Sequence, residues 1–595
     1  MPERPNQSGA LRALEDQIHA ALGDRPLDVL LRNVRLVDVY REVIVETDLG
    51  ISGDRIVSVL PGGDRQARVT VDAGGRYALP GFIDAHIHIE SALLTPDRLA
   101  EVVVPTGTTT LLVDPMEVSN VAGYEGLAEF LRALPSLPYR IFIEVSSRVP
   151  TAPGLETTGG ELGPGDVRRA LAWPASISLG ELDPSKVLGV QSSYLRKILS
   201  AHARGKIANG HAAGLQGRGL EAYATARLAD DHECVTLDDL KARLAVGMAV
   251  LIREGSSERN LRELVAGIVR DKLPTRHMLF CVDDKFSADL AREGHIDYNV
   301  NEAIRLGLSP MQAIQMASLN AAEHFRLDDR LGALVPGRWA DIILSDALDP
   351  IVPVQVYVGG RLVAEAGRLV AEVAPIRYAP WLLDTVHVSR GTRAAHFKLA
   401  ATGGQVWAAR VRVIEIVPDQ IINYFREAEL PVAGGQVQAD PAQDVLKIAV
   451  VERHGKNGNL AVAFAKGFGL KRGALASSVA HDHHNLVVLG ANDDDMAACV
   501  RALAKMHGGF VAVADGQTLA ALPLPIAGLM SDRPAGEVNR ALEKLNTAAR
   551  GLGSPLNSPF MTLSFVSLPS IPEAGLTDKG LIDVRSHKFV PVILQ

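Results

Sequence analysis

The sequence predicts an α/β protein: a (β/α)8 TIM-like barrel, a small β domain built from both flanks of that barrel, and a C-terminal α+β domain. Three observations predict this fold class. The chain of 595 residues is too long for one compact core. Short apolar strands alternate with helical patterns through its middle. Two β-rich segments of similar texture flank that middle part.

The N-terminal part is predicted to be a helical extension followed by the small β domain. Residues 1–27 are polar, have a helical pattern around Leu11 to Leu22, and lack the basic start and cleavage site of a secretory signal. Residues 28–80 contain β-rich runs such as 55–59, and similar runs return within residues 332–380. We therefore expect 28–80 and 332–380 to form one composite domain around an inserted one.

Residues 81–331 are predicted to form the barrel. Eight βα units in about 250 residues match the size of a closed (β/α)8 barrel. The predicted strands end near Asp84, Asp114, Val145, Glu181, His211, His232, Glu254 and Asp283. Because chemistry in this fold occurs at the C-terminal ends of the strands, the ionisable residues gathered there are candidates for an active site.

Residues 385–595 are predicted to form the C-terminal α+β domain. Strands are expected near 445–451, 486–489 and 510–514, and helices near 494–506 and 535–548.

The composition restricts the partners of the protein. A formal net charge of −8 argues against a polynucleotide, because phosphate binding needs a surplus of Lys and Arg. Three scattered cysteines suit a reducing cytoplasm rather than a disulfide framework. No apolar stretch approaches the roughly 20 residues that span a bilayer. We expect a small-molecule substrate, a cytoplasmic location, and neither a nucleic-acid nor a membrane partner.

The strongest chemical signal is the His-Ile-His sequence of residues 86–88. Side chains alternate faces along a strand, so His86 and His88 point the same way and can bind one metal ion. Imidazole suits zinc, iron and manganese-class metals. Two surface histidines are the alternative, but the pair follows an apolar strand at the start of the predicted barrel, which favours ligation.

Further candidate ligands lie where predicted barrel strands end. Any one of them alone is more often a capping or solvated residue, but their recurrence at successive strand ends favours a metal site. The candidate ligands are His86, His88, Glu181, His211, His232 and Asp283. Six ligands exceed the need of one tetrahedral ion and suit two ions that share Glu181 and a hydroxide.

Several segments together are typical of one family. They include residues 86–91, 107–110, 210–212, 231–234, 252–256 and 293–298, and in the C-terminal part 466–473, 477–482 and 522–532. With these segments the sequence resembles the adenine deaminase family of the metal-dependent amidohydrolase superfamily. The resemblance covers nearly the whole chain after residue 28.

The resemblance implies hydrolytic deamination of adenine to hypoxanthine and ammonia, in purine salvage, on two divalent cations. Mn²⁺ or Fe²⁺ is expected first, with Zn²⁺ as an alternative. Bound metal can lower the pKa of water from 15.7 to about 7, so a bridging hydroxide is expected to attack C6. Asp283 is expected to carry the proton to the leaving ammonia as general base and then acid. A homo-oligomer is also expected.

Other residues are candidates for substrate contact. Glu233 is expected to protonate the ring or position the substrate, or alternatively to orient His232. The remaining substrate-binding candidates are Glu90, Ser91, Arg253, Glu254 and Ser256, with Asp114 and Glu117 as additional site residues. A structural salt bridge is an equal alternative for Arg253 and Glu254.

The sequence departs from the family pattern near the predicted site. Met116 stands where similar enzymes usually carry His, and Leu182-Asp183-Pro184 replaces the usual Met-Met-Asn. Both departures leave the exact substrate open. In the C-terminal domain, His481, His483 and His484 are either a second metal site or a packed turn that covers the barrel mouth.

Two other functions compete with adenine deamination. One is hydrolysis of a related substrate, such as an N6-substituted adenine or another cyclic amidine or amide; hydantoinases and dihydroorotases, however, usually bridge their metals with a carbamylated Lys where this chain has Glu181. The other is a catalytically silent purine- or metal-binding relative. Zinc deaminases that act on nucleic acids are excluded, because they need a Cys-x-x-Cys motif that this sequence lacks.

Overall fold

The computed structural model describes residues 7–61, 63, 65–132, 134, 137–388, 391–401, 406–418, 422–570 and 573–594. Residues 1–6 of the predicted N-terminal extension lie outside this range. The rest of that extension contains α1 (Gln7–Leu22), as the helical pattern predicts. None of the described helices is both long and apolar enough to cross a membrane.

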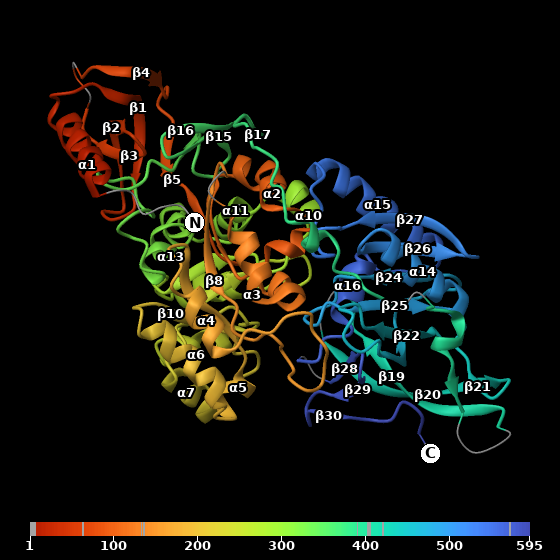
Figure 1. Cartoon of the computed structure of the whole chain (residues 1–595). Coiled ribbons are helices and arrows are strands. Elements are labelled where there is room, and N and C mark those ends of the chain that lie inside the picture. The colour runs from red at the N-terminus through yellow and green to blue at the C-terminus, as the bar shows by residue number, and fades with distance from the viewer. Residues whose placement is uncertain are drawn as a thin grey trace.

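A nine-stranded sheet combines strands from both sides of the middle of the chain. Its order is β17-β16-β15-β14-β5-β1-β2-β3, with β4 paired to β1. The strands are β1 Leu27–Asp38, β2 Val43–Ser52, β3 Arg55–Ser58, β4 Ala67–Asp72, β5 Tyr77–Pro80, β14 Ile342–Ser345, β15 Pro353–Val358, β16 Arg361–Glu365 and β17 Arg368–Leu369. β5 pairs antiparallel with β14 and so joins the two halves, which lie side by side in Figure 1.

The middle of the chain forms eight parallel strands. They are β6 Phe82–Ile87, β7 Thr108–Val113, β8 Arg140–Val145, β9 Ser176–Leu182, β10 Ile207–Gly210, β11 Asp230–Asp231, β12 Ala249–Arg253 and β13 Met278–Cys281. β6 to β10 make one sheet and β11 to β13 another. Parallel bridges Ala208↔Leu228 and Ile87↔Asp283 connect the two sheets at both ends. Each predicted strand end falls within three residues of an observed one.

Helices separate these strands along the chain. They are η1 Ile89–Ala92, α2 Pro96–Val103, η2 Val104–Thr106, α3 Met116–Arg132, α4 Pro164–Ala170, α5 Pro184–Leu188, α6 Ser192–His202, α7 Gly217–Thr225, α8 Leu237–Ala245, α9 Leu261–Asp271, α10 Ser287–Glu293, α11 Ile296–Arg305, α12 Pro310–Met316 and α13 Leu319–His324. β6, β7, β9, β12 and β13 are buried along their whole length, as parallel strands covered on both faces by other elements should be.

The first of these strands runs past its predicted end. β6 ends at Ile87 rather than near Asp84, so His86 lies inside the strand. The reason is pairing with the chain that follows β13. The backbone N–H of Asp283 donates to the carbonyl of His86, and the N–H of His88 donates to the carbonyl of Asp283. This pairing brings the first and last predicted ligands together.

The C-terminal region (described residues from 385 onward) contains a ten-stranded mixed sheet in the order β18-β21-β20-β19-β23-β22-β25-β24-β26-β27. The strands are β18 Leu399–Ala400, β19 Ala408–Ile416, β20 Asn423–Ala433, β21 Gln436–Val437, β22 Val445–Val451, β23 Leu460–Lys466, β24 Ala474–Ser477, β25 Leu486–Gly490, β26 Gly509–Ala514 and β27 Gln517–Pro523. The other elements are η4 Pro380–Leu383, just before it, η5 Ala394–Phe397, α14 Asp493–Lys505, α15 Ala535–Gly551, α16 Pro559–Phe565, β28 Ala574–Thr577, β29 Gly580–Asp583 and β30 Lys588–Phe589.

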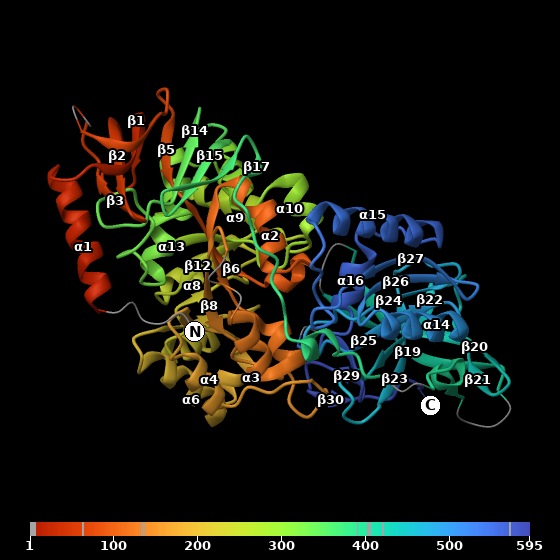
Figure 2. The same cartoon turned by 45° about the horizontal axis from the view of Figure 1, so that its top comes forward.

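The C-terminal region packs directly on the parallel-strand core. Figure 2 shows the segment after β17 running along α2 toward it, and α15 lying beside α10 and α2. The backbone N–H of Thr95 donates to the carbonyl of Ser531 at 3.1 Å. On another side, the Thr157 hydroxyl donates to Asp578 at 2.7 Å. The C-terminal region therefore contacts the segments that follow β6 and β8.

Candidate active site

The β6 strand places His86 and His88 on one side, with ring centroids 5.0 Å apart. His86 Nδ1 lies 2.6 Å from a carboxylate oxygen of Glu144 on β8, and His88 Nδ1 donates to the carbonyl of Asp114 at 2.9 Å. These contacts fix both rings and leave each Nε2 directed into the site. His86 Nε2 is buried and has no hydrogen-bond partner among the described residues.

Glu181, near the end of β9, lies between two groups of histidines. One of its oxygens is 2.8 Å from His211 Nδ1 and 3.0 Å from His232 Nε2, while the other is 3.6 Å from His88 Nε2. Burial raises the pKa of Glu181, but Arg148 and His211 outweigh burial and hold the pKa well below its ordinary value. Glu181 is therefore an ionised carboxylate with histidines on two sides.

Asp283 follows β13 and faces the first pair of histidines. One oxygen lies 3.7 Å from His86 Nε2 and 3.5 Å from His88 Nε2, and the other accepts a hydrogen bond from Arg253 at 2.8 Å. Burial raises the pKa of Asp283, but the charges of His232 and Arg253 lower it by a larger amount. The pKa of Asp283 therefore lies below its ordinary value. Its φ of 58° is the left-handed region that Asp tolerates better than most residues.

The six predicted ligands thus converge in one place. Three sets of potential ligand atoms each lie within 4.8 Å of one another: His86–His88–Glu181, His86–His232–Asp283 and Glu181–His211–His232. The sets overlap, so they describe one centre rather than three. Imidazole nitrogens and carboxylate oxygens suit divalent transition metals, and the unpartnered His86 Nε2 is accounted for by a bound ion. The residues present therefore fit a two-metal centre.

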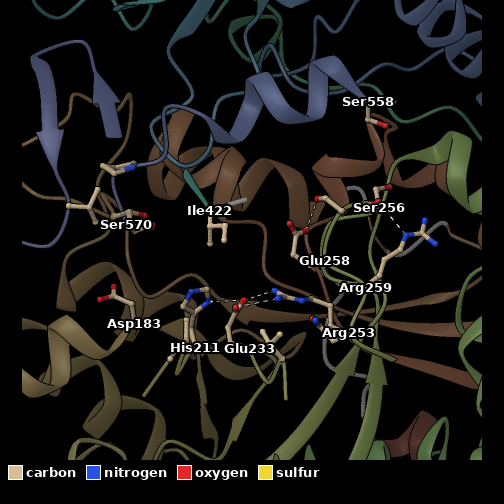
Figure 3. A pocket seen from close by; sticks show the side chains of 18 of the residues that line it. Asp183, His211, Glu233, Arg253, Ser256, Glu258, Arg259, Ile422, Ser558 and Ser570 are labelled. Atoms are coloured by element: carbon tan, nitrogen blue, oxygen red, sulfur yellow. Dashed lines mark hydrogen bonds and ion pairs between the residues drawn. The ribbon is translucent and has the colours of Figure 1, made fainter. Parts of the chain in front are cut away.

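Two adjacent cavities lie beside this centre. The inner cavity, of about 40 Å³, is lined by five of the six candidate ligands and is large enough for water. The outer cavity, of about 1820 Å³, is much larger. Five residues line both: His211, Glu233, Arg253, Glu258 and Ser570. In Figure 3 His211, Glu233 and Arg253 lie on one side, and Ile422 and Ser570 of the C-terminal region lie across from them.

Glu233 is held by Arg253 at the border of the two cavities. The Arg253 guanidinium donates to both carboxylate oxygens of Glu233, one of them at 3.2 Å. Burial opposes ionisation, but Arg253 and His211 bring the pKa of Glu233 down to about 2. Glu233 also lies 3.5 Å from His232 Nε2. As an ionised group it can accept a proton or a hydrogen bond, and it can donate a proton only after taking one up.

The other predicted substrate contacts fall in different places. Arg253 lines both cavities, and Ser256 lines the outer cavity while its hydroxyl donates to Asp289 at 2.5 Å. Glu254 lines neither cavity; its carboxylate accepts the Leu261 N–H at the start of α9, which favours its structural alternative.

Four of the predicted site residues lie behind the ligands. Glu90 accepts the backbone N–H of Val118 at 3.1 Å, and Ser91 donates to Asp284. Asp114 accepts a hydrogen bond from Ser146 at 2.5 Å, and burial raises its pKa to about 7. Glu117 lies 3.6 Å from His88 Nδ1. None of these four lines either cavity.

Sequence reasoning missed several residues of the site. Glu144 orients His86, and its signal was an acidic residue inside the apolar run of β8. Arg148 donates to Glu181 and lies 3.4 Å from Asp482 of the C-terminal region. Phe565 also lines the inner cavity. Arg148 lies in the loop just after β8, where no sequence pattern marked it. Phe565 had no local signal, because only packing of the C-terminal region brings it to the strand ends.

Comparison with known proteins agrees with this geometry. Residues 77–363 match the model of the amidohydrolase family, and residues 420–588 match that of the adenine deaminase C-terminal domain. The parallel α/β core of this chain, with histidines and carboxylates at its strand ends, is therefore the core of an amidohydrolase.

Relatives that match along the whole chain give the more particular assignment. The chain is 51% identical over 587 residues to an adenine deaminase of Desulforamulus reducens, covering 99% of each chain. It is 42% identical over 581 residues to that of Dehalococcoides mccartyi, covering 97% of this chain and 99% of the relative. The chain belongs to the adenine deaminase family within the amidohydrolase superfamily.

Proposed function

We propose that this protein catalyses the hydrolytic deamination of adenine, which converts adenine and water to hypoxanthine and ammonia. The observation that carries the proposal is the convergence of six metal-ligand candidates beside the Asp283–Arg253–Glu233 ion-pair chain. The relatives named above supply the substrate, since both are adenine deaminases over nearly their full length. A catalytically silent purine-binding relative would not need a complete set of metal ligands.

The proposed architecture follows the sequence prediction. The eight parallel strands form a closed (β/α)8 barrel over 81–331, supported by the bridges that link the two sheets at both ends. Residues 28–80 and 332–380 form the composite β domain, supported by their shared sheet. Residues 1–27 are proposed as an N-terminal helical extension, whose described part contains α1, and residues 385–595 as the C-terminal α+β domain. A homo-oligomer remains a prediction.

The proposed cofactor is a pair of divalent cations, Mn²⁺ or Fe²⁺ before Zn²⁺. His86, His88, His211, His232, Glu181 and Asp283 would hold them. When bound, such cations bring the pKa of water close to neutrality and so make it a nucleophile at physiological pH. Glu181, ionised and flanked by histidines on two sides, is the residue placed to serve both cations.

The chain's own groups then move protons and orient the ring. Asp283 accepts the proton of the attacking water and delivers it to the departing amine at C6. Arg253 keeps both Asp283 and Glu233 ionised until a proton arrives. Glu233, at the border of the cavities, binds a ring N–H or relays a proton to the ring nitrogen. The inner cavity holds the reacting water and the outer cavity admits the purine.

The test is ammonia release from a panel of bases by chelator-treated protein reloaded with Mn²⁺ or Fe²⁺. We expect release from adenine, none without metal, and no dependence on bicarbonate. Hydantoin and dihydroorotate serve as the controls for ring hydrolases. Hydrolysis of either control, or no ammonia from adenine with metal present, would overturn the proposal.

A further inference from the structure

A second cluster of potential metal ligands lies behind His88, outside the six-ligand centre. It joins Glu117, at the start of α3, to His481 and His484 in the segment 478–485 that follows β24. Ligand atoms of these three side chains lie within 4.8 Å of one another, and all three residues are buried. The cluster therefore connects the parallel-strand core to the C-terminal region.

The polar atoms of this cluster lack partners in the described part of the chain. Both carboxylate oxygens of Glu117 and both ring nitrogens of His484 are buried without a hydrogen bond. Both residues are 0% exposed. A buried polar atom without a partner costs free energy, and a buried unpaired carboxylate costs more. Four such atoms in one place indicate a bound group that satisfies them.

Charge indicates that this group is a cation. Glu117 and Glu90 are both buried carboxylates, and an oxygen of Glu90 is also without a hydrogen bond. No Lys or Arg among the described residues forms an ion pair with either carboxylate. A divalent cation would offset both charges.

Glu117 is separate from the six-ligand centre although it is close to it. Its carboxylate lies 3.6 Å from His88 Nδ1, the nitrogen that donates to the Asp114 carbonyl, whereas His88 Nε2 faces Glu181 and Asp283. On its other side Glu117 lies 3.7 Å from His481 Nδ1. His88 thus stands between the two groups of ligands.

We propose that Glu117, His481 and His484 bind a third divalent cation, in addition to the pair expected at the six-ligand centre. Two imidazoles and a carboxylate suit Zn²⁺, Mn²⁺ or Fe²⁺. The cation links α3 to the 478–485 segment, whose His481 and Asp482 line the inner cavity. Its role is to hold this part of the cavity wall in place. His483 does not belong to this set of neighbouring ligand atoms, and its Nδ1 accepts the Asn485 N–H at 3.0 Å.

The experiment counts metal ions and does not depend on deaminase activity. The full chain is treated with chelator and dialysed against Mn²⁺ alone, and bound manganese per chain is measured by mass spectrometry. We expect three ions in the wild type. Glu117→Gln and His484→Asn should each bind two, and His483→Asn, from the same buried segment, should still bind three. Glu117→Gln preserves side-chain size, so it tests the site even if His484→Asn does not fold.

Crystals of the manganese-loaded wild type give an independent measurement. An anomalous-scattering peak within bonding distance of Glu117 and His484 is expected. Two or fewer ions in the wild type, or three ions in Glu117→Gln, would overturn the proposal. In that case a proton shared between Glu90 and Glu117 would account for the two buried carboxylates.

Discussion

At the scale of single residues, Arg253 explains how two carboxylates stay ionised inside the site. Its guanidinium contacts Asp283 at 2.8 Å and Glu233 at 3.2 Å while only 4% of the residue is exposed. Charge-assisted hydrogen bonds of this kind favour the ionised form of a carboxylate. We therefore predict that Asp283 and Glu233 begin the proposed reaction as proton acceptors.

Asp283→Asn removes the proposed proton carrier and keeps the side chain's size. We expect kcat for adenine to fall by roughly 10²–10⁴-fold, the usual effect of losing general acid–base catalysis. Steady-state kinetics at saturating metal would measure it. Asp515→Asn, at a side chain that is 83% exposed, is the control and should leave kcat unchanged. A nearly normal kcat in Asp283→Asn would assign the proton transfer to Glu233 or Asp284.

Glu181→Gln tests the residue placed between the two groups of histidines. The amide keeps the size of the side chain but loses the charge that attracts two cations, so we expect at least one ion of the pair to be lost and activity to fall steeply. Metal content and ammonia release are measured together, with and without bicarbonate. Full metal content and full turnover in this variant would show that Glu181 is not shared by the two ions. Asp283, the other carboxylate among the six ligands, would then be the residue to test in its place.

At the scale of elements, α8 holds together the two loops that carry His211 and His232. Its buried Arg243 pairs with Asp231 at 2.7 Å and donates to the carbonyls of Ala212 and Leu215. Asp231 in turn accepts the backbone N–H of Ala212 at 2.8 Å. The positively charged Arg243 side chain therefore fixes the backbone of the loops that carry His211 and His232.

Arg243→Met leaves Asp231 buried without its charged partner. Breaking a buried ion pair in this way typically costs about 3–5 kcal/mol, so we expect a clearly lower melting temperature. We also expect weaker metal binding, because His211 and His232 lose their support. Calorimetry and manganese titration measure the two effects. Arg270→Met, on the adjacent α9 and 69% exposed at its side chain, is the matched control; an equal loss of stability there would contradict the account.

At the scale of the whole molecule, the C-terminal region closes over the ends of the parallel strands. Asp578 accepts hydrogen bonds from the backbone N–H of Thr157 at 2.9 Å and from its hydroxyl at 2.7 Å, and Arg148 lies 3.4 Å from Asp482. The loop after β8 is thus held between the core and the C-terminal region. Buried groups in this loop depend on that contact.

Glu156, in the same loop, makes the stability of the molecule depend on pH. Burial raises its pKa to about 7, above the value of about 4.3 expected when unfolded. The protonated Glu156 side chain contributes its full stabilisation below the pKa that Glu156 has in the unfolded chain. This contribution is lost as the pH rises through 7. Glu156→Gln should match the wild type's melting temperature at pH 4.5 and exceed it at pH 8, where the gain in stability should reach up to about 4 kcal/mol.

Differential scanning calorimetry across this pH range measures the effect. The exposed Glu161, in the same loop, provides the matched control, and Glu161→Gln should show no pH-dependent difference from the wild type. A melting temperature of Glu156→Gln that parallels the wild type at every pH would place the Glu156 carboxylate in contact with solvent.

The sequence by itself determined the parallel strands and the six candidate ligands. His86 and His88 share a face because alternation along a strand is a local property, and Glu181, His211 and Asp283 follow apolar runs that end at the same edge of the core. Such patterns can be recognised in a single segment, since an apolar run and the polar residue that ends it are consecutive in the chain.

Only the tertiary structure decided which other groups meet these ligands. Glu144 on β8 orients His86, Arg148 pairs with both Glu181 and Asp482, and Glu117 meets His481. The last two contacts join the core to a region more than 300 residues further along the chain. No periodicity links residues so far apart, because their approach depends on how two separately folded surfaces pack rather than on the pattern within either one.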